Sequence, residues 1–209
     1  MDNLDPARTA LLLVDFQCGV VSGMGMALAP HSADQAVANA RDVATALTER
    51  GGLVVLVRGS MGMTSVPFPS PRTDFQVPAG TMPPEAAEIV PELSELGAHV
   101  ITKHQWGSFY GTELDPLLRR RGITTLLLGG IATNLGVEST AREAYDRGYD
   151  QVLVEDAATA FDAQAHLDSV ARVFRLLALV RTADQVRAAL GYRGVPKPDL
   201  SANGAATRA

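Results

Sequence analysis

Short apolar runs alternate with longer stretches of helical periodicity along most of the chain. Six such runs, rich in Leu, Val, Ile and Thr, span residues 9–15, 53–57, 99–102, 123–128, 151–154 and 177–180. Near-continuous apolar runs are typical of parallel strands that are buried on both faces, and the stretches between them are long enough to form crossover helices. The alternation therefore predicts an α/β fold built around a six-stranded parallel sheet.

The stretches between the runs carry start and stop signals of helices. Gly51 and Gly52 end the first periodic stretch, and Thr182 with Gln185 forms a capping-box pair at the start of the last one. We expect helices at residues 32–50, 84–90, 112–121, 163–176 and 182–190, and one from the turn after the fourth run to Arg147.

Two segments lack helical or strand periodicity. Residues 16–31 are rich in Gly, Ser and Met, and we expect a loop there. Residues 59–83 are rich in Pro, Ser, Gly and Met and are too long for a routine connector. We expect this second segment to be a lid, a substrate loop or a subunit contact.

Length, charge and cysteine content argue against several classes of protein. The 209 residues, 46% of them hydrophobic, suffice for one domain with a full core. A net charge of −5 and a pI of about 5.3 give nucleic acid no electrostatic reason to bind, and no uncharged stretch is apolar enough for a membrane span. The first residues lack signal-peptide features, and the single Cys18 cannot form an internal disulfide. We therefore expect a cytoplasmic protein that binds neither nucleic acid nor a membrane.

The four histidines do not fall into a metal-ligand spacing along the chain. They are His31, His99, His104 and His166. We therefore expect neither a metal ion nor another cofactor.

Residues that carry chemistry follow three of the predicted strands. Asp15 ends the first run, Lys103 follows the third, and a Gly-rich turn at residues 129–136 opens the helix after the fourth. Because the carboxyl ends of parallel strands meet at one edge of an open sheet, a carboxylate, an ammonium group and helix-start N–H groups should converge there. Taken singly, Asp15 more often caps a turn and Lys103 is more often solvated. Their joint spacing favours a proton-transfer or hydrolytic site.

Three long segments resemble the isochorismatase-like cysteine hydrolase superfamily. They read LLLVDFQ, VITKHQWGSFYGTELDPLL and GGIATNLGVESTAREAYDRGYDQVLVEDAATA, and the resemblance runs from about residue 9 to 190. It implies a three-layer α/β/α sandwich with the Rossmann-like strand order 3-2-1-4-5-6, and a homodimer or larger homo-oligomer. We assign residues 1–193 to this hydrolase domain. The Pro/Ala/Ser tail at 194–209 is interpreted as a segment that docks on its own or a neighbouring subunit.

The resemblance also implies the catalytic residues. Asp15 and Lys103 match the family's Asp and Lys, whereas Gly136 stands where the motif A-T-D-x-C-V of most members has the nucleophilic cysteine. Isochorismatases of the superfamily also have glycine there and cleave a vinyl ether without a covalent intermediate. On that model Asp15 is the general acid, and Lys103 binds a substrate carboxylate or steadies the charge on Asp15.

The sequence thus predicts a hydrolase that acts on a small, carboxylate-bearing metabolite by Asp15-dependent acid/base chemistry. Isochorismatase-like vinyl ether hydrolysis is the nearest reaction. Two alternatives stay open: an inactive family member that keeps a ligand pocket, and an amidase-type hydrolase that uses Cys18.

The resemblance places further residues around the substrate. Trp106, Phe109 and Tyr110 are expected to wall the pocket, or else to fill a loop core or subunit interface. Arg58 is interpreted as a carboxylate clamp or as a solvated strand-end arginine. The remaining candidates for substrate binding are Gln17, Ala132, Asn134 and Leu135.

The resemblance also bears on one peptide bond and on metal binding. A cis peptide bond between Ile131 and Ala132 is expected to aim the N–H groups of the turn inward. The nicotinamidase branch binds metal with an Asp and His pair after the second strand, but residues 59–83 contain no His. The resemblance therefore gives no reason to expect zinc.

Overall fold

A six-stranded parallel sheet organises the computed structural model, which describes residues 3–60, 72, 74, 83–96 and 98–192. The strands are β1 (Thr9–Val14), β2 (Leu53–Gly59), β3 (His99–Lys103), β4 (Thr125–Ile131), β5 (Asp150–Thr159) and β6 (Leu179–Arg181). They pair in the order β3-β2-β1-β4-β5-β6, with every neighbouring pair parallel. The predicted α/β sandwich with the order 3-2-1-4-5-6 is confirmed.

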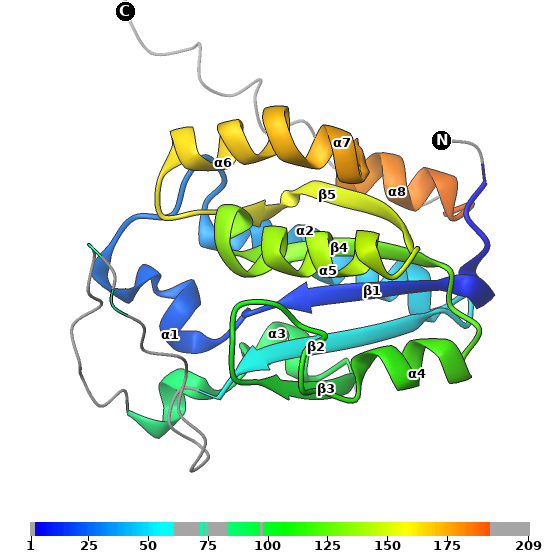
Figure 1. Cartoon of the computed structure of the whole chain (residues 1–209), viewed down its shortest axis with the longest axis horizontal. Coiled ribbons are helices and arrows are strands. Elements are labelled where there is room, and N and C mark those ends of the chain that lie inside the picture. The colour runs from blue at the N-terminus through cyan, green and yellow to red at the C-terminus, as the bar shows by residue number, and fades with distance from the viewer. Residues whose placement is uncertain (1–2, 61–71, 73, 75–82, 97, 193–209) are drawn as a thin grey trace, which may run out of the picture.

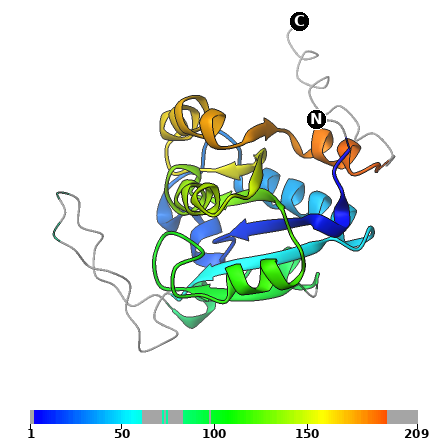
Figure 2. The same cartoon turned by 45° about the vertical axis from the view of Figure 1, so that its right-hand side comes forward.

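Helices cover both faces of the sheet (Figures 1 and 2). One face packs against α2 (Ala33–Thr48), α3 (Pro91–Ser94) and α8 (Ala183–Ala189). The other packs against α4 (Leu114–Arg120), α5 (Glu138–Asp146) and the helical run of α6 (Ala163–Ser169), η5 (Val170–Phe174) and α7 (Arg175–Leu177). Shorter helical turns are η1 (Pro6–Arg8), α1 (Cys18–Val21), η2 (Gly23–Gly25), η3 (Pro84–Ala87) and η4 (Thr133–Val137).

The core has two halves, one on each side of the sheet. Side chains alternate along β1, so Leu11 and Leu13 pack toward α2 while Leu12 and Val14 pack toward α4 and α5. All six residues of β1 are buried. A strand covered on both faces has no solvent-facing side, which is why its sequence is a continuous apolar run.

Capping residues set the starts of the helices as expected. The Ser32 hydroxyl accepts a hydrogen bond from the backbone N–H of Gln35 at the start of α2. At the start of α8, Thr182 and Gln185 form the predicted capping box.

Some local predictions were wrong. Residues 16–31 are not all loop, because they contain α1 and η2, and residues 84–90 hold only the 3₁₀ turn η3 before α3. Gly129 and Gly130 were assigned to a turn, but they belong to β4. A Cβ at Gly130 would lie 2.2 Å from the Val14 carbonyl oxygen, so glycine is required there by close packing against β1.

Two predicted features lie outside the described residues. They are the C-terminal tail at 194–209 and most of the segment 59–83, of which only residues 59, 60, 72, 74 and 83 are described. Docking of the tail and a lid or contact role for the segment stay predictions. Within the described part of the chain, no helix combines the length and the apolar character that a membrane crossing requires.

Candidate active site

Asp15, Lys103 and Gly136 meet at the carboxyl edge of the sheet. Asp15 follows β1, Lys103 is the last residue of β3, and Gly136 lies in η4, directly after β4. The Lys103 Nζ atom is 2.8 Å from Asp15 Oδ2. A Cβ atom at Gly136 would lie 2.9 Å from that oxygen and 3.1 Å from Nζ. The three residues predicted to be catalytic therefore lie within contact distance of one another.

Asp15 is held in a strained position. Its φ of 58° lies in the left-handed region, where non-glycine residues are uncommon, and its N–H donates to the Val57 carbonyl at 2.7 Å. The side chain is 17% exposed, and Oδ1 is buried without a hydrogen-bond partner among the described residues. Burial raises the pKa of Asp15, although the Lys103 charge counteracts this effect. Such a carboxyl group is suited to hold a proton.

Lys103 is a buried cation, with a side chain only 1% exposed. Its ammonium group donates to the Trp106 carbonyl oxygen at 2.6 Å as well as pairing with Asp15. A buried charge persists where partners compensate its lost hydration. The loop after β3 therefore fixes the ammonium group beside the carboxyl group.

Gly136 lies near the start of the helical run formed by η4 and α5. The Ile131–Ala132 peptide bond before this run is cis. The Ala132 carbonyl accepts from the N–H groups of Leu135 and Val137, and the Gly136 carbonyl accepts from the Thr140 hydroxyl at 2.7 Å. Among the predicted substrate residues of this turn, Ala132 is buried, whereas Asn134 and Leu135 are partly exposed.

Gln17 and Arg58 both contact other parts of the protein. Gln17 is buried, and its amide donates to the carbonyls of Gly59 and Ala87 and accepts from the Gly59 N–H. These polar atoms thus hold backbone segments together, and a role of Gln17 in substrate binding stays a prediction. Arg58 is partly exposed and lies 3.7 Å from Glu88, while its Nε donates to the Thr102 hydroxyl at 3.3 Å. The arginine is therefore engaged by the protein itself.

The three aromatic residues after β3 differ in burial. Phe109 is buried in the core beside Tyr149, with the Arg147 guanidinium over its ring. It therefore fills the core, which is the second of the two alternatives stated for it. Trp106 and Tyr110 are 59% and 73% exposed. The Trp106 backbone carbonyl accepts the hydrogen bond from Lys103.

Comparisons with known proteins agree with this architecture. Residues 9–185 match the isochorismatase domain. The isochorismatase family protein YwoC of Bacillus subtilis is 38% identical over 188 residues, which cover 88% of this chain and 94% of the relative. The chain belongs to the isochorismatase family. An isochorismatase family protein of Burkholderia thailandensis has a structure with a TM-score of 0.81 at 39% identity, covering 91% of this chain and 99% of that one.

A further solved relative is the N-carbamoylsarcosine amidase of Thermoplasma acidophilum. It matches with a TM-score of 0.62 at 27% identity and covers 85% of this chain and 97% of its own. The protein is thus an isochorismatase-family hydrolase, with the family's sheet carrying Asp15, Lys103 and Gly136 at its carboxyl edge.

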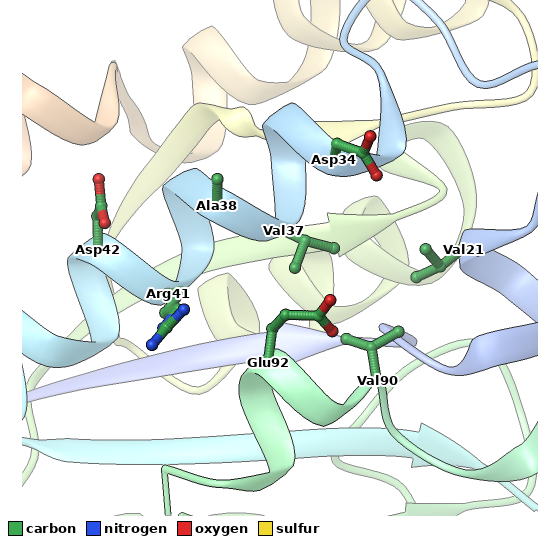
Figure 3. A pocket seen from close by; sticks show the side chains of 8 residues that line it. All are labelled: Val21, Asp34, Val37, Ala38, Arg41, Asp42, Val90 and Glu92. Carbon is green, nitrogen blue, oxygen red and sulfur yellow. The ribbon is translucent and has the colours of Figure 1, made fainter. Parts of the chain in front are cut away.

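Two other features of this isochorismatase-family chain are its cysteine and a surface hollow. Cys18, in α1, is partly buried and packs against the core on the α2 side of the sheet. A hollow of about 340 Å³ lies between α1, α2 and the start of α3 (Figure 3). Its lining comprises Val21, Asp34, Val37, Ala38, Arg41, Asp42, Val90 and Glu92. None of the predicted site residues lines this hollow.

Sequence analysis missed one cluster of titratable residues. His31, Glu155 and His166 are distant in the sequence, but their ligand atoms lie within 4.8 Å of one another. Hydrogen bonds from His166 and His31 lower the pKa of Glu155 to about 2, and the Glu155 carboxylate raises the pKa of His31. The histidines were judged only by their spacing along the chain, which carries no signal for a group assembled by the fold. The fold thus brings His31 and His166 together with Glu155 as possible metal ligands, although their spacing along the chain matches no metal-ligand motif.

Proposed function

We propose that this hydrolase acts on a small, carboxylate-bearing metabolite by acid/base chemistry at Asp15, without a covalent intermediate on the protein. The observation that carries the proposal is that the Asp15 carboxyl group, paired with Lys103, lies against a glycine at position 136. A glycine offers no nucleophile, and the Asp15–Lys103 pair lies against the position where a side chain would begin. The chemistry available is therefore proton transfer together with charge stabilisation.

Hydrolysis of an enol ether fits these groups. Asp15 transfers its proton to the terminal carbon of the C=C bond, and the positive charge spreads over the adjacent carbon and the ether oxygen. A water oxygen then bonds to that carbon and returns one proton to Asp15. The hemiketal breaks its C–O bond to give an alcohol and a keto acid. One water molecule is consumed, and the protein is left unchanged.

Lys103 supports this reaction in two ways. Its charge attracts a substrate carboxylate, and in the free protein the same charge opposes the rise in the pKa of Asp15 that burial causes. A bound substrate carboxylate offsets the Lys103 charge, so the pKa of Asp15 rises further when the substrate is in place. Substrate binding thus favours the protonated, acidic form of Asp15.

A substrate panel tests the proposed function. The purified chain is assayed with 1-carboxyvinyl ethers and with primary amides and N-carbamoyl amino acids, before and after complete alkylation of Cys18 by iodoacetamide. We expect keto acid release from an ether, with one solvent deuterium in the new methyl group in D₂O, and no effect of alkylation. Amide hydrolysis abolished by alkylation would assign the reaction to Cys18. No turnover of either class would favour an inactive, ligand-binding protein.

Replacement of Lys103 by Met gives a pH-dependent prediction. The variant removes the charge that lowers the pKa of Asp15, so this pKa should rise. A general acid works below its pKa, and kcat/KM therefore falls as the pH increases through it. In Lys103→Met the alkaline decline should move to higher pH, and kcat/KM should fall about 10- to 100-fold through loss of a charged hydrogen bond. A decline that stays at the wild-type pH would mean that another group titrates.

A further inference from the structure

A second group of side chains converges on one point, separate from Asp15 and Lys103. His31 comes from the segment before α2, Glu155 from β5 and His166 from α6. The Nε2 atoms of His31 and His166 lie 2.8 Å and 3.0 Å from the same carboxylate oxygen, Glu155 Oε1. The two rings meet edge to face, with centroids 5.7 Å apart. Both imidazoles thus direct the same nitrogen to one acidic oxygen.

Hydrogen bonds on its other side fix the ring of His166. Its Nδ1 is 2.8 Å from the Thr133 hydroxyl, which donates to the Thr159 carbonyl at 3.0 Å. Because a threonine hydroxyl has one proton, Thr133 accepts from the Nδ1–H of His166. With Nδ1–H donating to Thr133, the Nε2 atom faces Glu155 Oε1 at 3.0 Å, and either a proton or a metal cation between the two atoms makes this contact favourable. Histidine ligands of metals are held in the same way, by donation from the second ring nitrogen.

Burial and ligand chemistry favour a transition metal at this point. The His166 side chain is fully buried, whereas those of His31 and Glu155 are 19% and 25% exposed, which leaves an approach from solvent. Asp156 adds a carboxylate that interacts electrostatically with His31 and Glu155. Two imidazoles and a carboxylate suit Zn²⁺ better than Mg²⁺ or Ca²⁺, which prefer oxygen ligands.

We propose that His31, Glu155 and His166 bind one Zn²⁺ ion, with water completing the coordination. Ligand atoms at about 2.0–2.2 Å from a tetrahedral zinc ion lie about 3.3–3.6 Å apart. The three ligand atoms already lie within 4.8 Å of one another, so small side-chain shifts suffice. The ion then lies between His166 and Glu155 in place of a proton.

The bound ion ties three distant segments together. Through His166 it also supports Thr133, the first residue of the turn that carries Gly136. Zinc at this point therefore acts as a clamp, because it holds these segments together and supports the helix start that faces Asp15. Such a clamp stabilises the folded chain by mass action, because the ligands are together only when it is folded.

Direct metal binding tests this proposal. Full-length chain without a histidine tag is stripped with a chelator and titrated with Zn²⁺ against a chromophoric chelator, and its thermal unfolding is followed with and without Zn²⁺. We expect one ion per chain. With free Zn²⁺ at about 100 times Kd, Tm should rise by about 5–10 °C. Co²⁺ should give the visible absorption of a low-symmetry four- or five-coordinate site, and Mg²⁺ should have no effect.

Variants at the partly exposed ligands locate the site. Glu155→Gln and His31→Gln should weaken Zn²⁺ binding at least ten-fold and abolish the rise in Tm. His99→Gln replaces an exposed histidine at the start of β3 and should bind like the wild type. The unfolding of each metal-free variant shows whether it is folded. Absence of stoichiometric binding in the wild type, or equal binding by all three folded variants, would overturn the proposal.

Discussion

Replacement of Asp15 by Asn is expected to lower kcat/KM by about 10²- to 10⁴-fold, the contribution typical of a general acid. The amide has nearly the same shape as the carboxyl group, and its oxygen can still accept from Lys103, but it cannot supply the proton. Circular dichroism and Tm should therefore show a retained fold. The measurement is kcat/KM on the substrate that the panel identifies.

Two variants serve as controls for this result. Asp150→Asn makes the same chemical change at an exposed position at the start of β5 and should leave kcat/KM unchanged. Cys18→Ser removes the chain's single thiol and should also keep full activity. Undiminished turnover in Asp15→Asn would remove the carboxyl group from the mechanism, and loss of turnover in Cys18→Ser would point to thiol chemistry.

Replacement of Gly130 by Ala should destabilise the protein by more than about 4 kcal/mol, at the severe end for a point substitution. Gly130 has a φ of +144°, and an added Cβ would lie 2.2 Å from the Val14 carbonyl oxygen. That atom belongs to the backbone of β1, which pairs with β4 at this register, so it cannot rotate away. The free energy of unfolding is measured by urea denaturation, with insoluble expression as the extreme outcome.

Gly148→Ala separates the backbone strain from the steric clash. Gly148 also has a positive φ, of +77°, but an added Cβ meets no atom of the described chain within 4 Å. The expected cost is about 1–2 kcal/mol, for the left-handed conformation alone. If Gly130→Ala cost no more than this control, close packing between β1 and β4 would not be the reason for the glycine.

The strands and the pairing of Asp15 with Lys103 could be predicted because their signals are local. A run such as residues 9–15 is apolar throughout since β1 is buried on both faces, and that pattern needs no knowledge of its neighbours. Asp15 and Lys103 follow strand ends, and parallel pairing brings such ends to one edge whatever the loops do. The predicted order of the strands rested on the family resemblance, because periodicity alone does not specify it.

The remaining features depend on partners that the sequence does not reveal. Phe109 was expected either at a pocket wall or in a core, and the sequence could not decide, because the Tyr149 and Arg147 side chains that enclose it come from another part of the chain. His31 lies 124 positions from Glu155, and no spacing rule connects them. The two glycines of β4 resembled a turn in the sequence. The Val14 carbonyl that excludes a side chain at Gly130 belongs to β1, and the local sequence does not show this contact.

The buried amide of Gln17 has a consequence for how this hydrolase can diversify. It bonds to Gly59 at the end of β2 and to Ala87 in η3, so one side chain fixes both ends of the intervening stretch next to Asp15. Because the anchors are backbone atoms of Gly59 and Ala87, the sequence between them can vary without removing these hydrogen bonds. Such variation therefore leaves in place the acid that lies two residues before Gln17.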